Sequence, residues 1–156
     1  MSEKEFLAKL KEHQGIIYKL VHLYADTAED KKDFHQEIVL QAWKSYADFR
    51  GDSKFSTWLY KLCLHTLLTL KRKENRLQYS HDLQQYESHL TTTPGDEKEM
   101  LYKGIRSLPE IDKALVSLHL DGYGNQEISE IMGMSPNLVG VRLHRSKQQL
   151  IKFFKA

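Results

Sequence analysis

Apolar residues recur at helical spacing through most of the chain, and no segment shows the strict alternation of a half-buried strand. Two such stripes occupy the first 50 residues. The first consists of Phe6, Leu10, Ile17, Leu20 and Tyr24, and the second of Phe34, Ile38, Ala42, Tyr46 and Phe49. The polar segment 26–33 separates them as a connection or a helix start. The second stripe predicts an amphipathic helix that ends near Arg50, where Gly51 stops it.

A third stripe begins after Ser53, a plausible N-cap, and runs from Phe55 to Leu70. Its start is aromatic, and a basic cluster follows its end, comprising Lys71, Arg72, Lys73 and Arg76. Cations in a last helical turn interact favourably with the helix dipole, so this cluster has a purely structural explanation as well as a functional one.

The composition changes between residues 77 and 98, which are mostly polar and contain a Thr run and a Pro-Gly pair. Five acids and one lysine lie between Leu77 and Leu101. This composition indicates a linker. We therefore predict an all-α protein with two small helical domains, residues 1–76 and 99–156, joined by a polar acidic linker.

Helical periodicity resumes at Met100, and Pro109 opens a helix that Asp121-Gly122 ends. The segment "NQEISEIM" then leads into a turn that contains Gly133, and Ser135-Pro136 supplies an N-cap followed by proline at the first helical position. Two helices joined by a short turn with glycine are typical of a helix-turn-helix.

The last predicted helix carries five cations and no acid between Pro136 and Ala156. Such a helix fits the major groove of DNA and its phosphates. A plain helical hairpin with a solvated basic face is the competing interpretation. Leu138 and Gly140 lie where base-reading side chains are expected and offer no side-chain hydrogen bonds. Sequence reading there would depend on backbone contacts, methyl contacts and DNA shape.

Composition narrows the class of protein further. The net charge of +2 excludes a broadly basic coat but not a local basic face. The single cysteine, Cys63, lies in an apolar run, which favours a buried, reduced thiol in a cytoplasmic protein. We find no signal-peptide core and no apolar run near the ~20 residues that span a bilayer.

The sequence offers no motif for catalysis or for a cofactor. Its eight histidines include His81 and His89 in the linker, but no HExxH or Cys/His cluster accompanies them. A glycine-rich phosphate loop and a nucleophile elbow are also missing. We therefore expect neither an enzyme nor a metal protein.

The segment "GDSKFSTWLYKL" resembles a signature of the extracytoplasmic-function sigma factors, the smallest two-domain members of the sigma-70 family. "DFHQEIVLQAW", Asp33 to Trp43, resembles their second conserved helix. "LPEIDKALVSLHLDGYGNQEISEIMGMSPNLVGVRLHRSKQQL" resembles their C-terminal region. The resemblance implies a non-catalytic factor that binds core RNA polymerase, with an N-terminal domain that reads and melts the −10 promoter element and a C-terminal domain that reads the −35 element.

The resemblance also implies roles for individual residues. Those matching the polymerase-binding helix are Asp33, Gln36, Glu37 and Trp43. DNA-binding candidates in the N-terminal domain are Lys54, Trp58, Lys61, His65, Lys71, Arg72, Lys73 and Arg76. In the C-terminal domain they are Asn137, Arg142, Arg145 and Lys147. His65 replaces a frequent Asn near the pocket for the flipped −10 base, so the family's preference at that base does not carry over to this chain. Gly140 and Val141 replace a basic residue and Ser, which weakens the expected −35 contacts and suggests either an unusual −35 element or looser reading of it.

The main alternative is a polymerase-independent regulator with a helix-turn-helix. The segment Gly51–Arg76 argues against it, because a sensor domain has no need of this aromatic-then-basic pattern beside an acidic helix. An anti-sigma factor is a common partner in the family, although no residue of the sequence identifies one.

Overall fold

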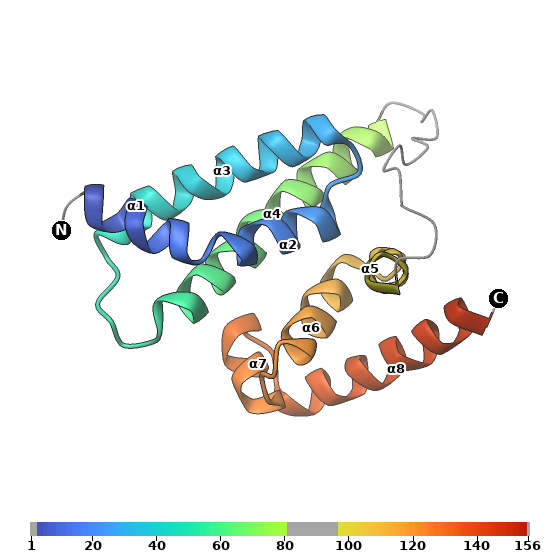
Figure 1. Cartoon of the computed structure of the whole chain (residues 1–156). Coiled ribbons are helices and arrows are strands. Elements are labelled where there is room, and N and C mark those ends of the chain that lie inside the picture. The colour runs from blue at the N-terminus through green and yellow to red at the C-terminus, as the bar shows by residue number, and fades with distance from the viewer. Residues whose placement is uncertain (1–2, 81–96, 156) are drawn as a thin grey trace. The chain divides into compact units, whose positions relative to one another are not determined.

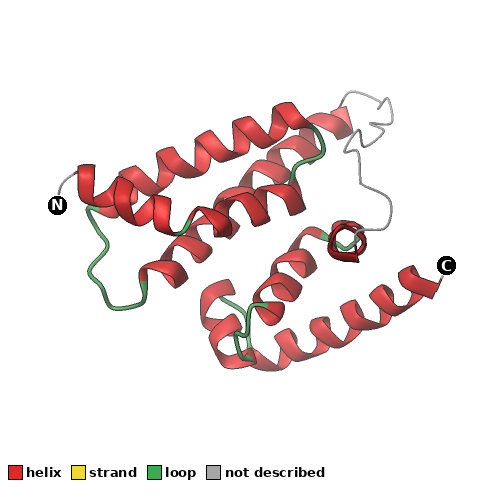
Figure 2. Cartoon of the chain, viewed as in Figure 1, coloured by secondary structure: helices red, strands yellow, loops and turns green. Residues whose placement is uncertain are grey.

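The computed structural model describes residues 3–80 and 97–155, and every regular element within these ranges is an α-helix. The helices belong to two compact units, Met1–Leu90 and Thr91–Ala156. Figure 1 shows the order of the helices, and Figure 2 shows the short loops that join them. The prediction of an all-α fold is confirmed for the described residues.

Within residues 3–80, the N-terminal unit contains four helices, α1 (Glu3–Glu12), α2 (Gln14–Tyr24), α3 (Ala28–Tyr46) and α4 (Phe55–Ser80). The helix α4 lies against both α2 and α3, which also contact each other. The three apolar stripes of the sequence meet in this bundle. Its largest fully buried side chains include Phe6, Ile17, Leu20, Tyr24, Ile38, Leu59, Tyr60, Leu64 and Leu67.

Cys63 is buried in the same core. Burial raises the pKa of its thiol to about 12, because the charged thiolate would lose its hydration there. The thiol is therefore protonated at neutral pH and is a packing group in this unit.

The structure adds one helix boundary that the sequence analysis did not predict and moves another. The first segment divides at His13, whose ring Nδ1 lies 2.9 Å from the carbonyl oxygen of Lys9, so that a side chain competes with the helical hydrogen bonds. The α-helix α3 ends at Tyr46 and not near Arg50. Its last carbonyls instead accept tighter bonds, from Asp48 N–H to Ser45 and from Phe49 N–H to Tyr46.

The described part of the C-terminal unit, residues 97–155, also contains four helices, α5 (Glu97–Arg106), α6 (Glu110–Leu120), α7 (Asn125–Met132) and α8 (Pro136–Lys155). The long helix α8 contacts each of the other three. Ile105, Leu115, Leu118, Ile128, Val139 and Leu143 are among the buried side chains. This unit therefore has its own apolar core.

The helices α7 and α8 form the predicted helix-turn-helix. Gly133 caps α7 with a left-handed φ of +71°, a conformation that glycine adopts without a steric penalty. Ser135 then accepts a hydrogen bond through Oγ from the Leu138 N–H at 3.1 Å, which caps α8. Both local signals in the sequence are confirmed.

The predicted linker, residues 77–98, overlaps the described helices at both ends. The helix α4 continues to Ser80, and α5 begins at Glu97. The remainder, with His81 and His89, lies outside the described residues.

Candidate nucleic-acid and polymerase interfaces

One exposed stripe runs along α4 and carries most of the N-terminal candidates for DNA binding. Lys61, His65, Arg72 and Arg76 are exposed and follow one another four or seven residues apart, which places them along one side of the helix. Lys73 is exposed at the edge of this stripe, and Lys54 is exposed just before α4 begins. The structure thus brings these cations onto one helix, with its core residues on the opposite side.

A hollow of about 320 Å³ lies between this stripe and α3. Three of the predicted residues, Trp58, Lys61 and His65, line it from α4. Gln41 and Ser45 line it from α3, and Leu62 and Thr66 complete its wall. The hollow therefore combines an aromatic ring, an imidazole, a cation and small polar groups, which suits a planar polar ligand such as a nucleobase.

Trp58 is half-buried in an aromatic cluster at the start of α4. Its ring centroid lies 5.2 Å from that of Phe49 and 5.3 Å from that of Phe55. Tyr46 joins the same cluster. Such contacts fix the ring, so that Trp58 forms a rigid wall of the hollow.

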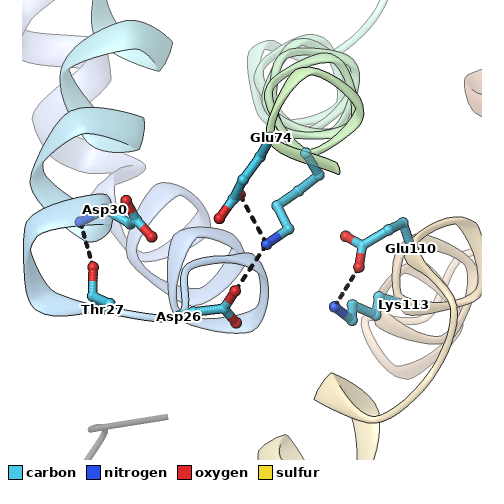
Figure 3. A network of polar contacts seen from close by, with 7 residues as sticks. Asp26, Thr27, Asp30, Glu74, Glu110 and Lys113 are labelled. Carbon is cyan, nitrogen blue, oxygen red and sulfur yellow. Dashed lines mark hydrogen bonds and ion pairs between the residues drawn. The ribbon is translucent and has the colours of Figure 1, made fainter. Parts of the chain in front are cut away.

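Lys71 occupies a different environment from the other α4 cations. It is only 5 % exposed, and its ammonium group lies 3.1 Å from Asp26 Oδ2 and 3.0 Å from Glu74 Oε2. Figure 3 shows the carboxylates of Asp26 and Glu74 directed at this one group. Thr27 beside them caps α3 by accepting the Asp30 N–H.

The electrostatics of Lys71 follow from this pairing. Burial by itself lowers the pKa of the ammonium group, but the contact with Glu74 and the negative charge of Asp26 outweigh it and raise the pKa above its ordinary value. Lys71 is thus charged at neutral pH and engaged in ion pairs, and we assign it to the stability of the N-terminal unit and not to the exposed cation stripe.

The predicted polymerase-binding residues lie on the part of α3 that faces away from its buried stripe. Asp33, Gln36 and Trp43 are exposed, and Glu37 is half-buried and accepts a hydrogen bond from Gln41 at 2.9 Å. Gln36 and Trp43 line a groove of about 460 Å³ between α1 and α3. Asp33 and Glu37 lie outside this groove's lining.

Sequence reasoning missed the apolar character of this groove. Leu7 on α1 is 51 % exposed, and Leu40 and Trp43 on α3 are 46 % and 45 % exposed. Contiguous exposed apolar groups of this kind mark interaction surfaces. Leu40 could have been found from the spacing alone, since it falls on the helix side of Gln36 and Trp43 and off the buried stripe.

The helix α8 presents Asn137, Arg145 and Lys147 to solvent, while Val139 and Leu143 on its other side are buried. Arg142 is half-buried, and its Nε donates to Asp112 Oδ1 of α6 at 2.8 Å. Arg142 thus anchors α8 to α6. In the same unit, Lys113 contacts Glu110 at 2.9 Å (Figure 3). Sequence reasoning overlooked exposed His144, one turn beyond Gly140, and exposed Asn125 at the start of α7.

No group of three or more His, Cys, Asp or Glu side chains within residues 3–80 and 97–155 has an arrangement that would hold a metal ion. No helix in those ranges is long and apolar enough to cross a bilayer.

Comparison with known proteins places the chain in a family. Residues 10–77 match a family model described as sigma-70 region 2, and residues 98–150 match one described as sigma-70, region 4. An ECF RNA polymerase sigma-E factor of Haemophilus influenzae is 29 % identical to the chain and aligns with 95 % of it and 86 % of its own length. The Escherichia coli K12 protein of the same description is 27 % identical, with 95 % and 85 % covered.

Solved structures show the same fold. The sigma factor RpoE of Bartonella quintana, in complex with the anti-sigma factor NepR, matches with a TM-score of 0.76 at 16 % identity, covering 98 % of both chains. CnrH in complex with the cytosolic domain of CnrY matches with a TM-score of 0.68 at 18 % identity, covering 99 % of this chain and 90 % of the other. The two sigma-70 regions follow each other in order along this all-helical chain. The chain therefore belongs to the sigma-70 family, as an extracytoplasmic-function sigma factor.

Proposed function

We propose that the two units divide the work of a sigma factor, which binds core RNA polymerase and directs it to promoters. The N-terminal unit holds the polymerase and opens the −10 element, and the C-terminal unit reads the −35 element as duplex. The observation that carries this division is the stripe on α4, where a hollow large enough to admit a base continues into a row of exposed cations.

Promoter opening needs both parts of that stripe. Unstacking a base from duplex DNA costs a few kcal/mol, and a pocket that stacks on the extruded base and bonds its edge offsets that cost. Trp58 and His65 supply the planar walls and a hydrogen-bonding ring. Lys61, Arg72, Lys73 and Arg76 then interact with the phosphates of the separated strand, which keeps it from re-pairing.

The groove between α1 and α3 is the proposed contact with core polymerase. Its apolar floor gains from burial against a partner, and the polar residues Gln36 and Asp33 at and beside it set orientation. Trp43 is the central anchor of this contact. Its exposed ring packs on Phe6, with ring centroids 5.2 Å apart, so that it is a rigid group of large contact area.

In the C-terminal unit, α8 is the proposed recognition helix in the major groove. Asn137 near its N-terminus faces base edges, and Arg145 and Lys147 contact phosphates. Arg142 holds α8 on α6 through Asp112, so we assign it a positioning role.

The setting of the protein follows from this function. Its work on chromosomal DNA places it in the cytoplasm, and the contribution to transcription is binding, without a reaction of its own. The similar Bartonella quintana structure is a complex of a sigma factor with an anti-sigma factor. We propose that this chain also has such a partner.

The exposed stripe can be tested by charge removal. The triple variant Arg72→Ala, Lys73→Ala, Arg76→Ala should bind core polymerase normally but give weak permanganate reactivity of −10 thymines, because the opened strand loses its phosphate contacts. Transcription from a template that is already mismatched across the −10 element should recover, because the protein no longer has to melt that segment.

The matched control removes three exposed lysines from elsewhere in the same unit, Lys4, Lys11 and Lys32. It should open duplex promoters as the unmodified protein does. Equal loss of opening in both triple variants would show that only the total positive charge of the unit matters, and it would refute the assigned role of the stripe.

A further inference from the structure

The recognition face of the C-terminal unit contains a hollow that the general helix-turn-helix arrangement does not require. It measures about 440 Å³, and its lining includes Asn125 from α7 with Asn137, Gly140, Val141 and Arg145 from α8. The feature that creates it is Gly140, which leaves a gap in the exposed side of the recognition helix.

The gap brings a residue of the preceding helix to the recognition face. A Cβ added to Gly140 would lie 3.6 Å from Asn125 Nδ2, in ordinary van der Waals contact, with nothing else near it. Any longer side chain at this position would extend into the hollow, between the Asn125 amide and an approaching base pair. In helix-turn-helix proteins the first helix usually crosses the DNA backbone, so a base contact from α7 depends on such a gap in α8.

The chemistry of the lining selects among base pairs. A side-chain amide pairs with adenine through N7 and N6, and an apolar side chain contacts the C5-methyl group of thymine. The hollow contains both kinds of group, the amide of Asn125 and the isopropyl group of Val141, which is 40 % exposed. Asn137, His144 and Arg145 of α8 also line the hollow, and Arg145 lies about a turn beyond Val141.

We infer that the hollow at Gly140 receives the major-groove edge of one A·T base pair, with the Asn125 amide on the adenine and Val141 against the thymine methyl. Gly140, Asn125 and Val141 thereby determine specificity at one position of the −35 element. This inference rests on the proposed function of the C-terminal unit and goes beyond it by naming the base pair and the residues that read it.

The test combines atomic changes in the DNA with changes in the protein. Holoenzyme assembled from the full chain and core polymerase first selects its −35 duplex from random sequence. Each thymine of that duplex is then replaced by uracil, which lacks only the methyl group, and each adenine by 7-deazaadenine, which lacks only the N7 acceptor. Binding is measured by competition against the selected duplex.

At one A·T pair, we expect uracil to weaken binding about threefold and 7-deazaadenine about five- to tenfold, the size of one lost contact or bond. The uracil penalty should vanish in Val141→Ala, and the 7-deazaadenine penalty should vanish in Asn125→Ala. Gly140→Leu should abolish both penalties by filling the hollow. Val141→Ala and Asn125→Ala each remove an exposed side chain, so circular dichroism should show an intact fold in both variants.

The outcomes separate the inference from the function on which it rests. Selection of a specific duplex, with penalties that persist unchanged in Val141→Ala and Asn125→Ala, would overturn the reading by this hollow and leave the −35 function standing. Failure of the holoenzyme to select any −35 sequence would overturn both.

Discussion

Lys71 and Lys73 lie two positions apart on α4, yet Lys71 is buried between two carboxylates and Lys73 is exposed. Helical geometry causes this, because residues two apart point about 200° from each other around the axis. The same basic run therefore contributes both to the stability of the N-terminal unit and to its surface.

We expect Lys71→Ala to lower the free energy of unfolding by about 1–3 kcal/mol, because it removes charge-assisted bonds from a buried site. Asp26 and Glu74 are partly exposed, which limits the cost of leaving them without the cation. Urea unfolding followed by tryptophan fluorescence checks this, since both tryptophans, Trp43 and Trp58, lie in this unit. Lys73→Ala should change stability by no more than about 0.5 kcal/mol, and equal losses would contradict the distinction.

The pH dependence of this contribution has a definite sign. The pKa of Lys71 is raised in the folded state, so its stabilisation is fully present below the unfolded-state pKa and is lost as pH rises through the folded-state pKa. The stability difference between the native protein and Lys71→Ala should therefore hold from neutral to mildly alkaline pH and shrink only in strong alkali. A difference that disappeared between pH 6 and about pH 8, well below the ordinary lysine pKa, would show that another group is responsible.

His65 gives a second prediction at this scale. His65→Ala should weaken promoter opening about five- to hundredfold without weakening core binding, the range found when an aromatic that stacks on a base is truncated. Fluorescence of 2-aminopurine placed in the −10 element reports the extruded base. Thr69→Ala is the control, because Thr69 is exposed one turn further along α4 and donates its hydroxyl proton to the His65 carbonyl. A larger effect of Thr69→Ala would place the pocket elsewhere.

At the scale of elements, the turn between α7 and α8 decides how the recognition helix leaves the body of the unit. Gly133 ends one helix and Ser135 begins the next, and both conformations depend on those residue types. We expect Ser135→Ala to cost about 1 kcal/mol and to raise amide hydrogen exchange in the first turns of α8. Ser135→Asp should restore protection, because aspartate also caps, whereas equal exchange in both variants would exclude a capping role.

The elements that sequence alone predicted well are those with local causes. A cap, a positive-φ glycine and an apolar stripe each act within a few residues, which is why the helix-turn-helix and the start of α8 were found. The missed features depend on distant parts of the chain. Lys71 contacts Asp26, 45 positions away, and Arg142 contacts Asp112, 30 positions away, so the sequence alone did not reveal that these two cations are engaged within the protein. The apolar groove needs α1 beside α3, and the Gly140 hollow needs α7 beside α8.

At the scale of the whole molecule, the proposed strand-opening surface and the proposed duplex-reading surface lie on separate units of one chain. The net charge of +2 leaves little general attraction to DNA, so binding should depend on a few placed cations. Arg145→Ala should reduce the slope of log affinity against log salt for −35 duplex binding by about 1, the value for one lost phosphate contact. Lys152→Ala, an exposed control near the end of α8, should leave the slope nearly unchanged, and the reverse order would move the phosphate contacts along the helix.

The most direct test of the central claim is run-off transcription with the purified chain and sigma-free bacterial core polymerase, on genomic fragments that include the region upstream of its own gene. We predict discrete transcripts that appear only when the chain is added, with shared −10 and −35 elements upstream of their starts. Core polymerase that neither binds the chain nor starts transcription at specific sites in its presence would contradict the assignment of this protein as a promoter-directing sigma factor.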